Sequence, residues 1–162
     1  MIKPWIENVA LGDVKSGNHY EAGLNSMLIQ IVDNDTEFPK PRYDFKEVRQ
    51  YKFLDVENTD IIKYGSAIND EQAKDIVESL KFALKNHMNV VVHCHYGICR
   101  SGAVAEVGVM LGFTDTEKFR SPNLMVKHKL LEQLGMAYDP NEPNSANGKA
   151  FVYDELNNKI YY

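Results

Sequence analysis

One short apolar run, Asn89-Val90-Val91-Val92, constrains the fold more than any other stretch of the sequence. Three consecutive β-branched residues are typical of a strand that is buried on both faces. Upstream, apolar residues recur every three or four positions, which predicts a helix of about four turns capped by Asn69 or Asp70. Downstream, this spacing returns over residues 103–111, and Gly112 can end that helix. The order helix, strand, loop, helix predicts an α/β fold with a central, mainly parallel sheet flanked by helices.

Three other segments have the pattern of strands. Residues 26–32 and 48–54 are short apolar or alternating runs between polar turns, and Trp5 to Leu11 is a third candidate. The sequence contains no repeat and no low-complexity tract that would mark a boundary. We therefore expect residues 1–162 to form a single domain.

A last helix is predicted from Pro122 to Leu134. Ser121 would cap it, proline would occupy its first position, and Gly135 would end it. The tail beyond this helix predicts no more than a short strand or a segment packed on the surface.

Composition and charge exclude several classes of function. The formal net charge of −5 disfavours a nucleic-acid or anionic-membrane binder, which would carry a basic excess. The most apolar segment, residues 103–113, is too short to span a bilayer and contains Glu106. Cys94 and Cys99 lie too close in sequence to staple a fold, so we expect free thiols in a reducing compartment. These features predict a cytoplasmic protein with neither a nucleic acid nor a membrane as partner.

The segment HCHYGICRS, residues 93–101, joins the predicted buried strand to the following helix. Such a loop collects backbone N–H groups at the positive end of the helix dipole, where an oxyanion binds. Arg100 would add a planar fork of donors that matches two phosphate oxygens, and Gly97 lets the loop turn tightly. The same positive potential favours a thiolate at Cys94, which could accept a phosphoryl group from a phosphate monoester. Ser101 lies near enough in sequence to assist that thiolate when it leaves.

The pattern His93-Cys94-x5-Arg100-Ser101 resembles the signature loop of cysteine-dependent protein tyrosine phosphatases, and its placement resembles their compact dual-specificity and prokaryotic branch. The resemblance covers roughly residues 48–111. It implies that Cys94 is the nucleophile, that Arg100 binds phosphate, that Ser101 helps to hydrolyse the intermediate, and that His93 orients the loop. It implies no metal and no cofactor. The substrate phosphate would lie against the loop residues His95, Tyr96, Gly97, Ile98, Cys99 and Arg100.

The variable loop positions 95–99 contain no lysine or arginine. By the same resemblance, enzymes for polyphosphorylated inositides carry extra cations there, so we expect a phosphorylated protein or peptide as partner. The predicted activity is hydrolysis of phosphotyrosine, with phosphoserine and phosphothreonine as further candidates; a nucleotide or RNA 5′-phosphate stays open. Phosphotyrosine preference needs an aromatic side chain beside the loop, and the sequence does not choose between Tyr20, Tyr43 and Tyr64.

The leaving group needs a proton donor on a nearby loop. In the family that the chain resembles, this donor is an aspartate after the strand that precedes the long helix, and Asp55 fits that place. Asp60, five residues later, is the alternative, and Glu57 is a third candidate. We favour Asp55 because residues 61–69 can be absorbed as a loop before the helix.

Other readings stay open. Cys94-x4-Cys99-Arg100-Ser101 also resembles the loop of low-molecular-weight phosphatases and arsenate reductases, where an Asp-Pro such as Asp139-Pro140 supplies the acid. That loop lies near the amino terminus, whereas here strands precede it, so Asp139 is more simply explained as a turn former. A phospho-ligand-binding module without turnover and a sulfurtransferase are further alternatives.

Cys99 departs from the small hydroxyl residue that is usual at its position in the dual-specificity branch. In a loop folded around an anion it would approach Cys94 closely enough to form a disulfide under peroxide. Its alternative role is that of a small side chain packed under the loop.

Overall fold

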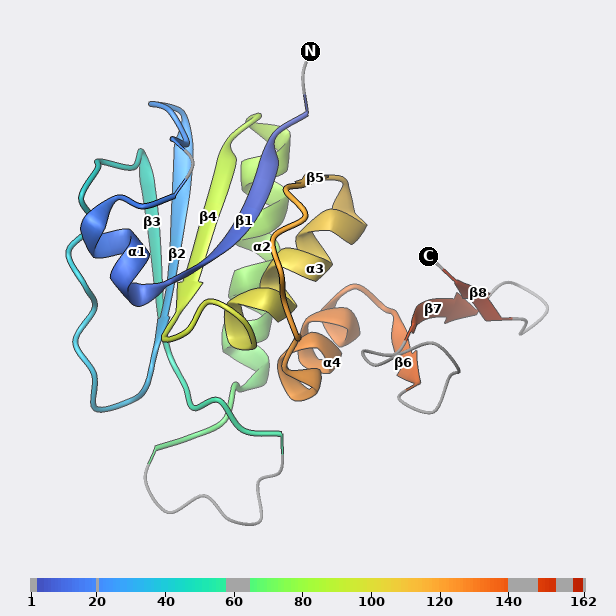
Figure 1. The fold of residues 1–162 in the computed structure, drawn as a ribbon. Helices are drawn as coiled ribbons and strands as arrows, with labels where there is room; N and C mark the ends of the chain where they lie inside the picture. The colour runs from blue at the N-terminus through green and yellow to red at the C-terminus, as the bar shows by residue number, and fades with distance from the viewer. Residues whose placement is uncertain (1–2, 20, 58–64, 140–148, 154–158, 162) are drawn as a thin grey trace.

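The protein has an α/β fold with a five-stranded parallel sheet, as the sequence predicts (Figure 1). This computed structural model describes residues 3–19, 21–57, 65–139, 149–153 and 159–161. The strand order is β3-β2-β4-β1-β5, and each neighbouring pair is parallel. The strands are β1 Trp5–Ala10, β2 Ser26–Val32, β3 Glu47–Lys52, β4 Asn89–Cys94 and β5 Thr114–Asp115.

Strand β4 lies at the centre of this sheet and is buried on both faces, which confirms the prediction from its β-branched run. Val90 and Val92 belong to the larger hydrophobic core, whereas Val91 points into a smaller cluster on the opposite face. Val14 of the short helix α1 (Leu11–Ser16) packs in that smaller cluster. The alternation of side chains along a strand thus places a core on each face of the sheet.

Three longer helices cover the face with the larger core: α2 Asp70–Lys85, α3 Arg100–Leu111 and α4 Leu124–Gln133. Figure 1 shows them together on one side of the sheet, with α1 on the other side. Each contributes fully buried apolar side chains, among them Ile76 and Leu80 of α2, Val104 and Val107 of α3, and Leu130 and Leu131 of α4.

The start of α2 confirms the predicted cap. The Asn69 side chain accepts a hydrogen bond from the Gln72 backbone N–H at 2.7 Å, and the Gln72 side chain in turn accepts one from the Asn69 N–H at 3.0 Å. This capping box satisfies two donors that would otherwise have no partner within the helix. Gly112, the residue after α3, has a φ of 129°, a value open to glycine, and it ends that helix as expected.

The predicted boundaries of α4 are wrong at its start. Asn123, rather than Ser121, is the N-cap, and its side chain accepts a hydrogen bond from the Val126 N–H at 3.0 Å. Pro122 therefore precedes the helix instead of opening it. The sequence offers two capping residues two positions apart, and contacts with distant segments select the second.

Two further differences lie near the edges of the sheet. Strand β3 ends at Lys52 instead of at residue 54, because the Leu54 N–H leaves the sheet to bond the Ser66 carbonyl at 2.7 Å. Helix α1 was not predicted: Leu11, expected in the first strand, opens it, and the Asp13 side chain accepts a hydrogen bond from the Ala10 N–H at 3.1 Å. A helix of six residues is too short for a periodic signal.

The C-terminal tail forms a separate three-stranded antiparallel sheet from β6 Ala137–Asp139, β7 Lys149–Tyr153 and β8 Lys159–Tyr161. Asp139 pairs with Lys149 in this sheet, so it is a strand residue and the expectation of a turn former is wrong. Across the described part of the chain, no helix combines the length and the apolar character needed to cross a bilayer.

Candidate active site

The loop of residues 95–99 connects the carboxyl end of β4 to the first residue of α3, as predicted. Its carbonyl groups point to the surrounding scaffold: those of His95 and Ile98 accept hydrogen bonds at 3.1 Å from the N–H groups of Leu11 and Ser121. None of the described residues accepts a hydrogen bond from the N–H groups of positions 95–99. A loop with engaged carbonyls and open N–H groups is suited to bind an anion.

Gly97 is required by the backbone of this loop. Its φ is 74°, and a Cβ at this position would lie 2.3 Å from the carbonyl carbon of Val9. The Gly97 carbonyl accepts a hydrogen bond at 2.7 Å from the side chain of Asn8, a fully buried residue of β1. Strand β1, which pairs with β4, therefore holds the loop at Gly97 through the side chain of Asn8.

Cys94 is the last residue of β4 and is 3% exposed. Its Sγ lies 3.1 Å from the Oγ of Ser101, which is itself fully buried in the first turn of α3. The structure therefore brings together the two residues that the sequence assigned to attack and to the later release of the thiolate. A hydroxyl that donates to a sulfur anion stabilises it.

Arg100 is held by one edge of its guanidinium group. Its Nη1 donates to Asp33 Oδ1 at 2.7 Å and to the carbonyl of Phe53 at 2.8 Å, and the side chain is 4% exposed. Its Nε is also buried and finds no hydrogen-bond partner among the described residues. The residues that follow strands β2 and β3 thus fix one side of the guanidinium group. On its other side, the buried Nε–H has no acceptor among the described residues.

Sequence reasoning missed Asp33. It is the first residue after β2, and β2 pairs directly with β4, so the topology places it beside the loop. A single aspartate after a strand gives no local signal that distinguishes it from a solvated carboxylate. Only its position at a common edge of parallel strands relates it to Arg100.

His93 lies fully buried in β4, next to Cys94. Burial lowers its pKa from 6.5 to about 4; a hydrogen bond with the Cys94 carbonyl opposes this shift, and the Arg100 charge adds to it. The imidazole is therefore neutral at neutral pH. Its Nδ1 lies 3.4 Å from the Cys94 carbonyl oxygen, and because a carbonyl only accepts, Nδ1 carries the proton. His93 is in a position to orient the backbone that leads into the loop.

Of the three candidate proton donors, Asp55 and Glu57 lie in described residues and Asp60 lies outside them. Both described side chains are exposed and both contact the start of α4. Asp55 Oδ1 accepts a hydrogen bond from Asn123 Nδ2 at 2.7 Å, and Glu57 Oε1 accepts one from the Leu124 N–H at 3.0 Å. The Glu57 carboxylate therefore binds the N-terminus of α4 and is not free.

Cys99 is a half-buried free thiol. Burial raises its pKa above the ordinary value, and the negative charges of Asp55, Cys94 and Glu57 add to this effect. The two carboxylates are thus close enough to the loop to act on its electrostatics. The raised pKa keeps Cys99 protonated at neutral pH.

The aromatic side chain nearest to the loop belongs to the loop itself. Tyr96 is 74% exposed and packs edge-on against His95, with ring centroids 4.5 Å apart. Of the tyrosines proposed from the sequence, Tyr20 and Tyr64 lie outside the described residues, and Tyr43 packs edge-on against His19. Tyr96 is therefore an exposed aromatic side chain within the loop itself.

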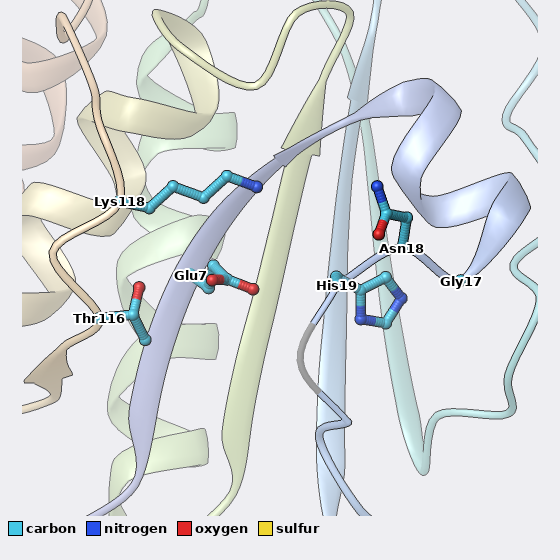
Figure 2. A pocket seen from close by; sticks show the side chains of 6 residues that line it. All are labelled: Glu7, Gly17, Asn18, His19, Thr116 and Lys118. Atoms are coloured by element: carbon cyan, nitrogen blue, oxygen red, sulfur yellow. The ribbon is translucent and has the colours of Figure 1, made fainter.

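A cavity of about 480 Å³ lies away from these residues. It is lined by Glu7, Gly17, Asn18, His19, Thr116 and Lys118 (Figure 2). A much smaller hollow of about 10 Å³ lies beside the loop, between Asp33, His95 and Arg100. Within the described ranges, no group of three or more His, Cys, Asp or Glu side chains is placed to hold a metal ion.

Compared with models of protein families and with curated proteins, the chain matches none. Its function is therefore inferred from the site geometry.

Proposed function

We propose that the protein is a cysteine-dependent phosphatase that hydrolyses phosphate monoesters on proteins through a cysteinyl-phosphate intermediate. The observation that carries this proposal is the state of Arg100. Its guanidinium is anchored at Nη1, and its buried Nε has no described acceptor. A buried donor without a partner is costly, and a phosphate oxygen would satisfy it. The N–H groups of the 95–99 loop would bind the remaining oxygens.

In the first step, the Cys94 thiolate attacks phosphorus, a sulfur–phosphorus bond forms, and the bond to the leaving oxygen breaks. Asp55 donates its proton to that oxygen, so the substrate leaves as a neutral alcohol or phenol. In the second step, water attacks the thiophosphate, Asp55 takes up the proton, and the sulfur leaves as a thiolate. Ser101 Oγ, 3.1 Å from the sulfur, stabilises the charge that returns to it.

Phosphotyrosine is the substrate that we place first, followed by phosphoserine and phosphothreonine. The variable loop positions carry no lysine or arginine for additional phosphate groups. Tyr96 offers an exposed aromatic surface beside the loop, and aromatic rings pack well against one another. Because the mechanism needs a reduced Cys94, we infer that the protein works in a reducing compartment such as the cytoplasm.

A low-molecular-weight phosphatase or arsenate reductase arrangement has less support. The loop follows the fourth strand in chain order, whereas in that family it lies near the amino terminus. Asp139, which would supply the acid, belongs to the separate three-stranded sheet. Asp55, in contrast, contacts Asn123, whose N–H bonds the Cys99 carbonyl of the loop.

The test is steady-state hydrolysis of p-nitrophenyl phosphate without added metal. We expect turnover by the wild-type protein and a loss of at least about 10³-fold in Cys94→Ser, since an alcohol is a poor substitute for the thiolate. Cys99→Ser is the matched control and should retain activity. If the reduced wild-type protein binds phosphate but shows no turnover, the chain is a phospho-ligand-binding module and the proposed activity is wrong.

A further inference from the structure

Asn123 joins three segments of the candidate site, although only 2% of it is exposed. Its backbone N–H donates to the Cys99 carbonyl in the loop at 2.9 Å. Its side-chain Nδ2 donates to Asp55 Oδ1 at 2.7 Å and to the Val56 carbonyl at 3.1 Å. One residue thus connects the loop that would bind phosphate with the segment that would protonate the leaving group.

The orientation of this amide is set by the helix that follows it. Asn123 is the N-cap of α4, and its Oδ1 accepts a hydrogen bond from the Val126 N–H at 3.0 Å. With Oδ1 committed to the helix, Nδ2 must face residues 55 and 56. The cap fixes the orientation of the Asn123 amide, and the amide in turn holds the Asp55 carboxylate. The place of Asp55 therefore depends on where α4 begins.

We propose that Asn123 is a positioning residue for the reaction: it holds one oxygen of Asp55 and leaves the other to carry the proton that reaches the substrate. This inference rests on the proposed function. A proton donor that is not held near the leaving oxygen contributes little, because general-acid catalysis depends on geometry before acidity. Asn123 would thus act through Asp55 without touching the substrate.

Glu57 provides a second contact of the same kind. Its Oε1 accepts from the Leu124 N–H at 3.0 Å, at the positive end of the α4 dipole. Residues 55–57 are therefore held at both ends by the first turn of one helix. Since Glu57 is exposed, its contribution should be smaller than that of the buried Asn123.

The experiment compares two substrates that differ in how much they need an acid. Phenyl phosphate has a poor leaving group, whereas p-nitrophenyl phosphate has a good one. In Asn123→Ser the hydroxyl still caps α4, but the amide donor to Asp55 is lost. We expect kcat/KM for phenyl phosphate, which reports the step in which the leaving group departs, to fall about tenfold or more. We expect kcat/KM for p-nitrophenyl phosphate to fall much less, and the inhibition constant of phosphate to stay within about twofold.

Three further variants separate positioning from folding. Asn123→Asp keeps the shape and the cap but removes the amide donor to Asp55, so kcat/KM for phenyl phosphate should fall as it does in Asn123→Ser. Glu57→Ala should shift the ratio of the two kcat/KM values in the same direction, while Glu57→Gln, whose amide oxygen can still accept from Leu124, should restore it. The two variants at the exposed Glu57 keep the test usable if substitutions at Asn123 prevent folding.

The outcomes distinguish the two proposals. Turnover of neither substrate by the wild-type protein would overturn the proposed function and this inference with it. Wild-type turnover combined with an unchanged substrate ratio in folded Asn123→Ser, or in Glu57→Ala if the Asn123 variants do not fold, would overturn the inference alone. In an Asp55→Asn background, Asn123→Ser should cause no further change in the ratio; an additive loss would also contradict it.

Discussion

Asp33 and Arg100, 67 positions apart in the chain, form an ion pair with 2.7 Å between Oδ1 and Nη1. The arginine end of this pair is buried, whereas the aspartate side chain is 45% exposed. The main effect of this pair is therefore to fix the orientation of the Arg100 guanidinium group, because the aspartate itself is only half-buried. The negative charge of Asp33 also repels a phosphate dianion. Asp33 would therefore lower the affinity for phosphate while it orients the Arg100 guanidinium group.

Replacement of Asp33 should separate these two effects. In Asp33→Ala the guanidinium loses an anchor, and we expect kcat for p-nitrophenyl phosphate to fall about tenfold. Asp33→Asn keeps an acceptor for Nη1 but removes the charge, so kcat should stay nearer the wild-type value while phosphate inhibits more strongly. The control is Asp35→Ala, at an exposed residue of the same turn. Equal kcat values in Asp33→Ala and wild type would contradict the anchoring role.

The backbone of the loop gives a stability prediction that needs no activity. Gly97→Ala should lower the free energy of unfolding by at least about 2 kcal/mol, because φ is 74° and the added Cβ would meet the Val9 backbone at 2.3 Å. Gly12→Ala, in α1, is the matched control: apart from its chain neighbours and the helix's own backbone, no described atom lies within 4 Å of the added Cβ. It should change stability by no more than about 1 kcal/mol. Urea denaturation measures both, and similar losses would argue against the strain at Gly97.

His93 predicts a pH dependence of stability. Its folded pKa of about 4 lies below the value of 6.5 for the unfolded chain, so acid protonates the unfolded state first. The contribution of His93 is complete above pH 6.5 and is lost as the pH falls towards 4, a change of about 3 kcal/mol.

Denaturation at pH 7, 5.5 and 4 measures this effect. His93→Asn, whose amide can donate to the Cys94 carbonyl but does not titrate, should show a flatter profile than the wild type. His95→Gln, at an exposed position, is the control and should follow the wild-type profile. Parallel profiles for wild type and His93→Asn would mean that His93 is not buried in the neutral form.

Cys99 predicts how the site responds to oxidation. Peroxide would convert the Cys94 thiolate to a sulfenic acid, and the Cys99 thiol would then displace water to form a disulfide that dithiothreitol reduces. Cys99→Ser should therefore keep its activity but recover less of it than the wild type after peroxide and then dithiothreitol. Equal recovery would leave Cys99 as a side chain packed beside the loop.

The sequence predicted the parts of the fold that depend on neighbours along the chain. The β-branched run of β4, the apolar spacing of α2 and the capping pair at Asn69 each carry a local signal, and each forms as expected. Helix α1 and the start of α4 were missed or misplaced, since six residues carry no periodicity and two caps were available. The loop between β4 and α3, in contrast, was predicted from the types and spacing of the residues from Cys94 to Ser101.

The tertiary structure alone decided which distant side chains complete the site. Asp33 contacts Arg100 and Asn8 contacts the loop at Gly97, from two separate places in the chain, and neither stands out from its sequence neighbours. Glu57, a candidate acid by position, turned out to bind the start of α4. Types and spacing of nearby residues determine which chemistry a loop can support, because backbone geometry is local. Which groups orient that chemistry depends on strand order and helix placement, which bring together residues that the chain keeps far apart.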